Sequence, residues 1–140
     1  MILALYTRLN KVAKTEYGDI VLEGKVMKSS TGRARKLRLS LIDETYIDVW
    51  YSTDQSYAYH WEQATRRDFV YRHDNAPHAS WKTVATFPKH CHEGTESHVK
   101  ESSLPDDPEE ALREFLSQVR RLMMAFGAQP PRPQEPGQAS

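Results

Sequence analysis

The six histidines of this 140-residue chain are concentrated in one part of the sequence. All of them lie between positions 60 and 98, and the other 101 residues contain none. Imidazole titrates near neutral pH, so histidine serves as an acid or a base in catalysis, and it is also the commonest metal ligand. The clustering therefore predicts a functional site within this segment. The six are His60, His73, His78, His90, His92 and His98.

Acid–base catalysis without a metal is the first interpretation of this cluster. Two histidines in opposite protonation states can deprotonate a nucleophile and protonate a leaving group. An arginine such as Arg72 can stabilise the negative charge that develops on a phosphate. RNA suits this chemistry, because its 2′-hydroxyl is a built-in nucleophile that needs only a base, an acid and a charge stabiliser.

A metal site and a structural role are the alternatives. His90 and His92 are two residues apart, so their side chains point the same way if the segment is extended. The spacing matches no well-known zinc motif. In the structural interpretation, His73 is a hydrogen-bonded residue at the edge of the core and His98 is an ordinary surface residue. Four neighbours could complete a ligand shell, namely Cys91, His73, His78 or Asp74.

Alternating apolar residues predict the sheet that would position these groups. Five stretches between about residues 19 and 73 have the period of two that is typical of half-buried strands, and turn sequences separate them. Short connections favour hairpins, and therefore a meander. The expected cross-strand pairs are Leu22–Leu39, Leu39–Val49, Val49–Tyr59 and Trp61–Phe69. In that register one face is apolar, and the other collects Lys36, Arg38, Trp50, His60, Glu62 and Arg72.

A C-terminal helix is predicted over residues 108–126. Asp107 is suited to the N-cap, Pro108 to the first helical position and Gly127 to the left-handed C-terminal cap. Apolar residues at i, i+3 and i+4 spacing form a stripe that should pack on the apolar face of the sheet. The stripe consists of Leu112, Phe115, Leu116, Val119, Leu122, Met123 and Phe126.

The whole pattern indicates one α+β domain over residues 1–127, in which a curved antiparallel sheet of about five strands packs against the C-terminal helix. Residues 74–98 are expected to form a histidine-rich functional loop with one edge strand at most. The first fifteen residues fit either a strand or a short helix. The proline-rich residues 128–140 are expected to be a disordered tail.

Charge and composition limit the binding partners and the cellular location expected for the protein. The net charge is zero, but residues 1–41 carry a balance of +6 and the remainder a balance of −6. The basic half could face a polyanion such as RNA. No apolar run is long enough to span a membrane, and the N-terminus does not have the pattern of a secretory signal. The single cysteine, Cys91, excludes an internal disulfide framework and is consistent with a cytoplasmic protein.

Three segments of the chain resemble the TumE-type toxin family of prokaryotic type II toxin–antitoxin systems. They are residues 57–61 (YAYHW), 71–78 (YRHDNAPH) and 87–92 (FPKHCH), and the similarity extends over about residues 20–126. The DNAPH run is the most specific part. The sequence departs from the family pattern, in which Trp, His, His and Lys are expected, at His73, Ala79, Lys89 and Cys91.

The resemblance implies a growth-inhibiting toxin that acts on RNA and is neutralised by an antitoxin with a helix-turn-helix domain. We therefore expect a metal-independent ribonuclease with no cofactor, and we leave a homodimer open. The candidate catalytic residues are His60, Arg72, Asp74, Asn75, His78, His90 and His92, with His60 and either His78 or His90 as base and acid. The candidate RNA-binding residues are Lys36, Arg38, Trp50 and Lys89.

Two other classes of function remain open from the sequence. The chain could be a non-catalytic module that binds RNA or protein and inhibits growth by occupying its target, or it could be a metal-dependent nuclease. A structural element that responds to pH or metal is a further alternative, which is supported only by the number of histidines.

Overall fold

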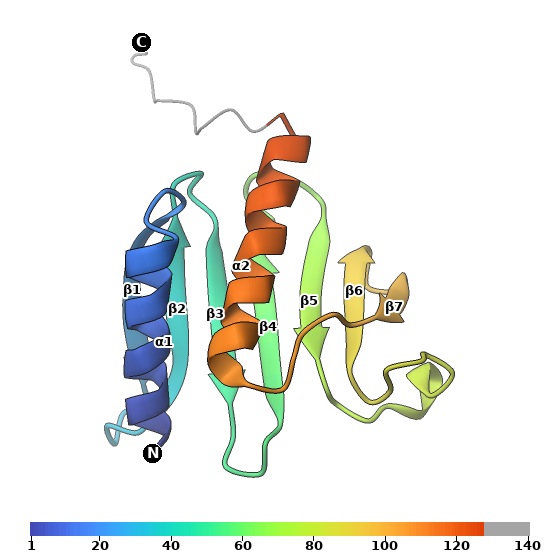
Figure 1. Ribbon diagram of the computed structural model, residues 1–140, viewed down its shortest axis with the longest axis horizontal. Coiled ribbons are helices and arrows are strands. Elements are labelled where there is room, and N and C mark those ends of the chain that lie inside the picture. The colour runs from blue at the N-terminus through green and yellow to red at the C-terminus, as the bar shows by residue number, and fades with distance from the viewer. Residues whose placement is uncertain (128–140) are drawn as a thin grey trace.

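The computed structural model describes residues 1–127, which form a seven-stranded antiparallel sheet with two helices packed on one face (Figure 1). The strands lie in the order β1 to β7, so each one pairs with its neighbour in the sequence. This confirms the α+β class and the meander. The elements are α1 (Ile2–Glu16), β1 (Val21–Lys28), β2 (Ala34–Leu41), β3 (Tyr46–Tyr51), β4 (Tyr57–Glu62), β5 (Val70–Asp74), η1 (Ala79–Trp81), β6 (His90–Gly94), β7 (Val99–Glu101) and α2 (Pro108–Ala125).

The prediction of about five strands was wrong, because residues 74–98 are not one continuous loop. β5 extends to Asp74, and β6 pairs with it along its whole length. β7 then adds a short edge strand beyond β6. Within this range only residues 75–89, which contain the 3₁₀ turn η1, and the short turn 95–98 lie outside the sheet. Cys91 is the one apolar residue among the first three of β6, so a pattern of alternating hydrophobicity could not indicate this strand. The strand is defined instead by its pairing with β5.

The first fifteen residues form a helix, which the sequence alone did not decide. α1 buries Tyr6 and Leu9 against the sheet. The Tyr6 hydroxyl donates a hydrogen bond to the Arg35 carbonyl at 3.0 Å and accepts one from the Tyr51 amide at 3.1 Å. The helix is therefore fixed to β2 and β3 by polar contacts as well as by packing.

The strand registers agree with the expected faces but only partly with the expected pairs. Val49 pairs with Tyr59 as predicted. Leu39 instead pairs with Gly24 and Ile47, and Trp61 pairs with Tyr71. These differences are shifts of two residues, which leave every side chain on the same face.

Leu22 is the exception to the predicted faces, because 64% of its side chain is exposed. A register shift between Val21 and Glu23 interrupts the alternation of β1 at this point. β1 is also an edge strand, so its first residues are not held to the pattern of the central strands.

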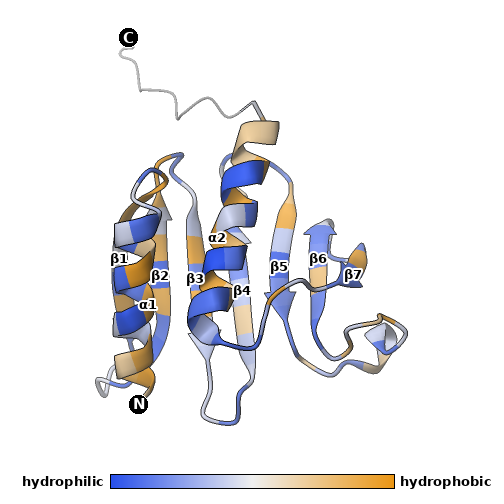
Figure 2. Cartoon of the chain, in the orientation of Figure 1, coloured by the Kyte–Doolittle hydropathy of each residue, from blue (hydrophilic) through white to orange (hydrophobic). Residues whose placement is uncertain are grey.

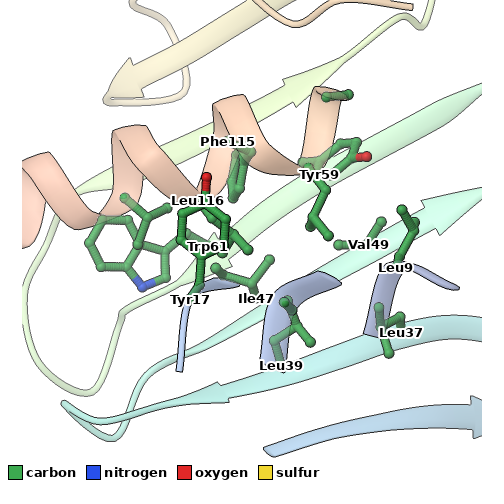
Figure 3. Close-up of a cluster of buried hydrophobic side chains, with 14 of the residues drawn as sticks. Leu9, Tyr17, Leu37, Leu39, Ile47, Val49, Tyr59, Trp61, Phe115 and Leu116 are labelled. Carbon is green, nitrogen blue, oxygen red and sulfur yellow. The ribbon is translucent and has the colours of Figure 1, made fainter. Parts of the chain in front are cut away.

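The core lies between the helices and the inner face of the sheet. Figure 3 shows Leu9 of α1 and Phe115 of α2 among the apolar side chains of the central strands. Phe115 stacks on Tyr71, with ring centroids 5.2 Å apart and ring planes 23° apart. α2 begins as predicted, since the Asp107 carboxylate accepts a hydrogen bond from the Glu110 amide at 3.0 Å.

The opposite face of the sheet is covered by neither helix (Figure 1). Hydrophobic and hydrophilic residues alternate along the strands (Figure 2), so this uncovered face carries the polar side chains. Neither α1 nor α2 combines the length and the hydropathy that crossing a membrane requires. The stretch expected to be a disordered tail, residues 128–140, lies outside the described residues.

Candidate functional site

Two rows of side chains cross the uncovered face of the sheet. The strand registers place residues of neighbouring strands opposite one another, and alternate residues of each strand share a face. The first row is Arg38, Asp48, His60, Arg72 and His92. The second row is Trp50, Ala58, Asp74 and His90.

The two rows end in a pocket of about 580 Å³ at the β4–β5–β6 part of the sheet. Residues 75–81, which follow β5, form the other side of the pocket. It contains six of the seven predicted catalytic residues, the exception being His60. The lining residues are Trp50, Ser56, Tyr57, Ala58, Arg72, Asp74, Asn75, Ala76, Pro77, His78, Ser80, Trp81, His90, His92 and Glu96.

Asn75 fixes the chain as it leaves β5. Its Oδ1 accepts a hydrogen bond from the Tyr57 amide at 2.9 Å, and its Nδ2 donates one to the Gln55 carbonyl at 3.0 Å. The Asp74 carboxylate accepts a hydrogen bond from the Ala76 amide at 3.0 Å. The DNAP run is therefore a turn that directs the following residues along the edge of the pocket.

His90 and His92 form the floor of the pocket. They are 0% and 3% exposed, and their ring centroids lie 5.0 Å apart. Nδ1 of His90 lies 2.8 Å from the Pro88 carbonyl, and Nδ1 of His92 lies 2.8 Å from the Glu96 carbonyl. A carbonyl oxygen only accepts, so both Nδ1 atoms carry hydrogen and Nε2 of each neutral ring carries a lone pair.

Nε2 of His90 lies 3.2 Å from the Asp74 carboxylate. With the hydrogen on Nδ1, both Nε2 and the carboxylate are acceptors, so Nε2 is buried without a hydrogen-bond partner among the described residues. Burial lowers the pKa of His92, and the nearby Arg72 guanidinium adds to the shift. Because each Nδ1 donates to a carbonyl, Nε2 is the nitrogen of each ring that is left to accept a proton or bind a metal ion.

Arg72 supplies the positive charge of the pocket. Its Nε donates to the Asp74 carboxylate at 3.1 Å, and its two terminal nitrogens lie 3.1 and 3.2 Å from the two oxygens of Glu96. The Glu96 side chain is 59% exposed. Glu96 could not be recognised from the sequence, because its place beside Arg72 depends on the β6–β7 hairpin, which no sequence pattern indicated.

His78 and Trp81 lie at the rim of the pocket. His78 is exposed, and its side chain caps nothing in the η1 turn that follows it. The Trp81 ring lies 5.8 Å from the His92 ring in an edge-to-face arrangement. An exposed imidazole and a partly exposed indole next to the floor can serve as a proton donor and a stacking surface, respectively.

A second pocket, of about 690 Å³, adjoins the first and shares Trp50 and Ala58 with it. His60 lines this second pocket rather than the first, and its Nε2 lies 3.2 Å from the Glu62 carboxylate. Lys36 also lines it. The structure thus places His60 beside the other candidates, as the cross-strand partner of Arg72, but not in the same pocket.

The basic candidates are engaged with carboxylates. Lys36 and Arg38 both bind Asp48, at 2.9 and 2.8 Å. Lys89 pairs with Asp106 at 3.0 Å and lines neither of the two pockets. Lys36 and Arg38 therefore contribute a net single positive charge to the uncovered face, and Lys89 lies apart from it.

His73 and Cys91 face the core instead of the pocket. Both ring nitrogens of His73 are hydrogen-bonded, to the Ser102 and Tyr71 hydroxyls at 2.7 and 3.0 Å. Burial lowers the pKa of His73 to about 3 and raises the pKa of the Cys91 thiol to about 12. Neither residue can complete a ligand shell with His90 and His92, because the side chains lie on opposite faces of the sheet.

A comparison with protein-family models matches residues 10–123 to the family described as Toxin TumE. The chain belongs to the TumE toxin family. The TumE match includes all seven strands and most of α2, and so includes every residue of the pocket. Membership makes the chain a toxin of a toxin–antitoxin module, with an antitoxin as its partner. Searches of curated proteins and of solved structures find no match to the chain.

Proposed function

We propose that this TumE toxin inhibits growth by cleaving RNA in the pocket formed by β5, β6 and residues 75–81. One observation carries the proposal. The imidazoles of His90 and His92, from β6, and the guanidinium of Arg72, from β5, line one open pocket. Nitrogen bases next to a phosphate-binding cation are the groups that phosphodiester cleavage requires.

RNA fits the surroundings of this pocket. Arg72 would bind a phosphate, and the indoles of Trp50 and Trp81 would stack on bases. The adjoining pocket is lined by Arg33, Arg35 and Lys36, whose charge would attract the continuing backbone. The two pockets share Trp50, so a single strand could pass from one to the other.

The reaction we propose uses the 2′-hydroxyl of the RNA as the nucleophile. A base at the floor of the pocket takes the 2′-hydroxyl proton, and the 2′-oxygen forms a bond to phosphorus. The bond from phosphorus to the 5′-oxygen breaks, and that oxygen takes a proton from an acid, for which the exposed His78 is the candidate. The products are a 2′,3′-cyclic phosphate and a 5′-hydroxyl. Arg72 stabilises the charge on the phosphate oxygens.

Antitoxin neutralisation would follow from covering this pocket. A helix-turn-helix antitoxin encoded beside the toxin is the partner that we propose. A homodimer of the toxin is compatible with the proposal but is not required by it, since every residue named in the reaction comes from one chain.

Induced expression in cells tests the proposal. We expect wild-type toxin to arrest growth, with cellular RNA cleaved to fragments that carry 2′,3′-cyclic phosphate ends. His78→Ala and His92→Ala should restore growth and leave the RNA intact, and the neighbouring antitoxin gene should do the same for wild type. His98→Ala is the matched control, because His98 is exposed and lines neither pocket. Growth arrest with intact RNA would contradict cleavage and would favour a toxin that only binds its target.

A further inference from the structure

Asp74, His90 and His92 are arranged in the manner of a metal-binding group. One ligand atom from each lies within 4.8 Å of the other two. They come from adjacent positions of the paired strands β5 and β6, where Asp74 lies directly opposite His90. The pairing of two strands therefore holds the three groups together.

Hydrogen bonds to the backbone orient both imidazoles. The Pro88 and Glu96 carbonyls accept from the two Nδ1 atoms, which leaves Nε2 of each ring as the nitrogen with a lone pair. A metal-binding histidine almost always donates its other ring N–H to a carbonyl or a carboxylate in this way.

The surroundings leave one of these nitrogens without any other partner. Nε2 of His90 is completely buried and makes no hydrogen bond among the described residues. A buried polar atom without a partner is costly, and a bound cation would remove that cost. The unpartnered nitrogen lies 3.2 Å from the Asp74 carboxylate.

The spacing suits a small cation. Ligand atoms of a tetrahedral zinc ion lie about 3.3 Å apart, given bonds of about 2.0 Å. The distance from His90 Nε2 to Asp74 is already 3.2 Å. The third ligand atom, within 4.8 Å of the others, needs a side-chain movement of roughly 1–1.5 Å to complete the set.

We infer that Asp74, His90 and His92 bind one divalent first-row transition-metal ion of the zinc class, with its remaining coordination positions open to the pocket. Two imidazoles and one carboxylate favour such an ion over Mg²⁺ or Ca²⁺, which prefer oxygen ligands. Three protein ligands with an open position are typical of catalytic rather than structural zinc. The positive charge of Arg72 repels the ion, but the carboxylates of Asp74 and Glu96, which pair with Arg72, offset this repulsion.

This inference deepens the proposed function, because it gives the phosphate a second cationic partner at the floor of the pocket. It departs from the metal-independent mechanism expected from the sequence. With the ion bound, His90 and His92 would be ligands and could not also act as the base of the proposed reaction. The ion would instead supply the positive charge that lowers the pKa of the 2′-hydroxyl and stabilises the phosphate oxygens.

Metal titration of the untagged, metal-stripped protein is the direct test. Calorimetry with Zn²⁺ should show one equivalent bound with a dissociation constant in the micromolar range or below. Co²⁺ should give the visible absorption of a nitrogen–oxygen site. His92→Ala and Asp74→Asn should weaken binding at least 100-fold, whereas His98→Ala should leave it unchanged. Circular dichroism of each variant shows whether the fold is retained, and Asp74→Glu gives a second substitution that keeps the carboxylate.

RNA cleavage by the same samples separates this inference from the proposed function. Binding of one equivalent that the variants lose supports the metal site, even if no sample cleaves RNA. Wild-type protein that binds no metal, or that binds it equally in His92→Ala, overturns the metal site. Cleavage at full rate after the metal has been removed overturns its catalytic use and leaves the ribonuclease proposal standing.

Discussion

Arg72 and Glu96 form a two-point ion pair at the mouth of the pocket, with nitrogen–oxygen distances of 3.1 and 3.2 Å. The carboxylate thus occupies the two guanidinium nitrogens that a phosphate would bind. Carboxylate and phosphate can each accept two parallel hydrogen bonds from one guanidinium. Asp74 holds the remaining Nε of Arg72 at 3.1 Å. Phosphate binding therefore requires Glu96 to move away, and its exposure permits this.

Glu96→Gln should strengthen RNA binding. The substitution keeps the shape of the side chain, but it removes the negative charge that competes with phosphate for Arg72. We expect an affinity gain of about threefold to tenfold, equivalent to roughly 1 kcal/mol, at low salt. Fluorescence anisotropy with a short single-stranded RNA measures the change.

Glu93→Gln is the control for this prediction, because Glu93 lies on the same hairpin but pairs with Lys100, at 2.8 Å. An equal gain in both variants would show that net charge alone is responsible. No gain in Glu96→Gln would contradict the competition between Glu96 and phosphate.

Asn75→Ala should lower both stability and activity. It removes the hydrogen bonds to the Tyr57 amide and the Gln55 carbonyl, and the loss should reduce the free energy of unfolding by about 1–2 kcal/mol. The segment that carries His78 and Trp81 would lose its attachment to β4, so RNA cleavage should fall even where the protein is folded. Urea denaturation and cleavage assays measure the two effects.

Asn75→Asp separates the two hydrogen bonds of this residue, because the carboxylate still accepts from the Tyr57 amide but cannot donate to Gln55. It should recover part of the lost stability. A fully stable and active Asn75→Ala protein would rule out a positioning role for this turn.

His73 should make the fold sensitive to acid. Its folded pKa is about 3, below the ordinary value of 6.5, because the ring is buried. The unfolded chain therefore binds the proton more readily, so stability is full above about pH 6.5 and falls as the pH drops toward 3. The loss attributable to His73 should reach roughly 2.5 kcal/mol at pH 4.5.

His73→Phe tests the assignment, because phenylalanine fills the same space without titrating. Between pH 7 and pH 4.5 the unfolding free energy of wild type should fall by about 2.5 kcal/mol more than that of the variant. Parallel pH profiles of the two proteins would contradict it.

The sequence predicted the central sheet well, because a strand that is buried on one face must alternate apolar and polar residues. Val49 and Tyr59 were placed opposite one another correctly. A two-residue error, such as pairing Leu39 with Val49 instead of Ile47, changes no face, and alternation carries no information that could prevent it. The edges were harder to predict: Leu22 is exposed at a register shift in β1, and β6 depends on its pairing with β5.

Six of the seven candidate catalytic residues line one pocket, while their catalytic role stays a prediction. The histidine count and the DNAPH run pointed to residues that line one pocket. The opposite faces of Cys91 and His90 follow only once β6 is known to be a strand, and the contact of Glu96 with Arg72 needs the hairpin after it. His60 was grouped with Arg72 because they share a face, yet a shared face does not determine which of two adjoining pockets a ring lines.

Cleavage of RNA by the purified protein is the most direct test of the central claim, that the pocket of Arg72, His90 and His92 is an active site. End-labelled single-stranded RNA would be incubated with wild type, His92→Ala, Arg72→Ala and the control His98→Ala, each with Zn²⁺ present. We predict that wild type and His98→Ala cleave at equal rates and that the two pocket variants are slower by at least 100-fold. Cleavage at the wild-type rate by both folded pocket variants would contradict the account.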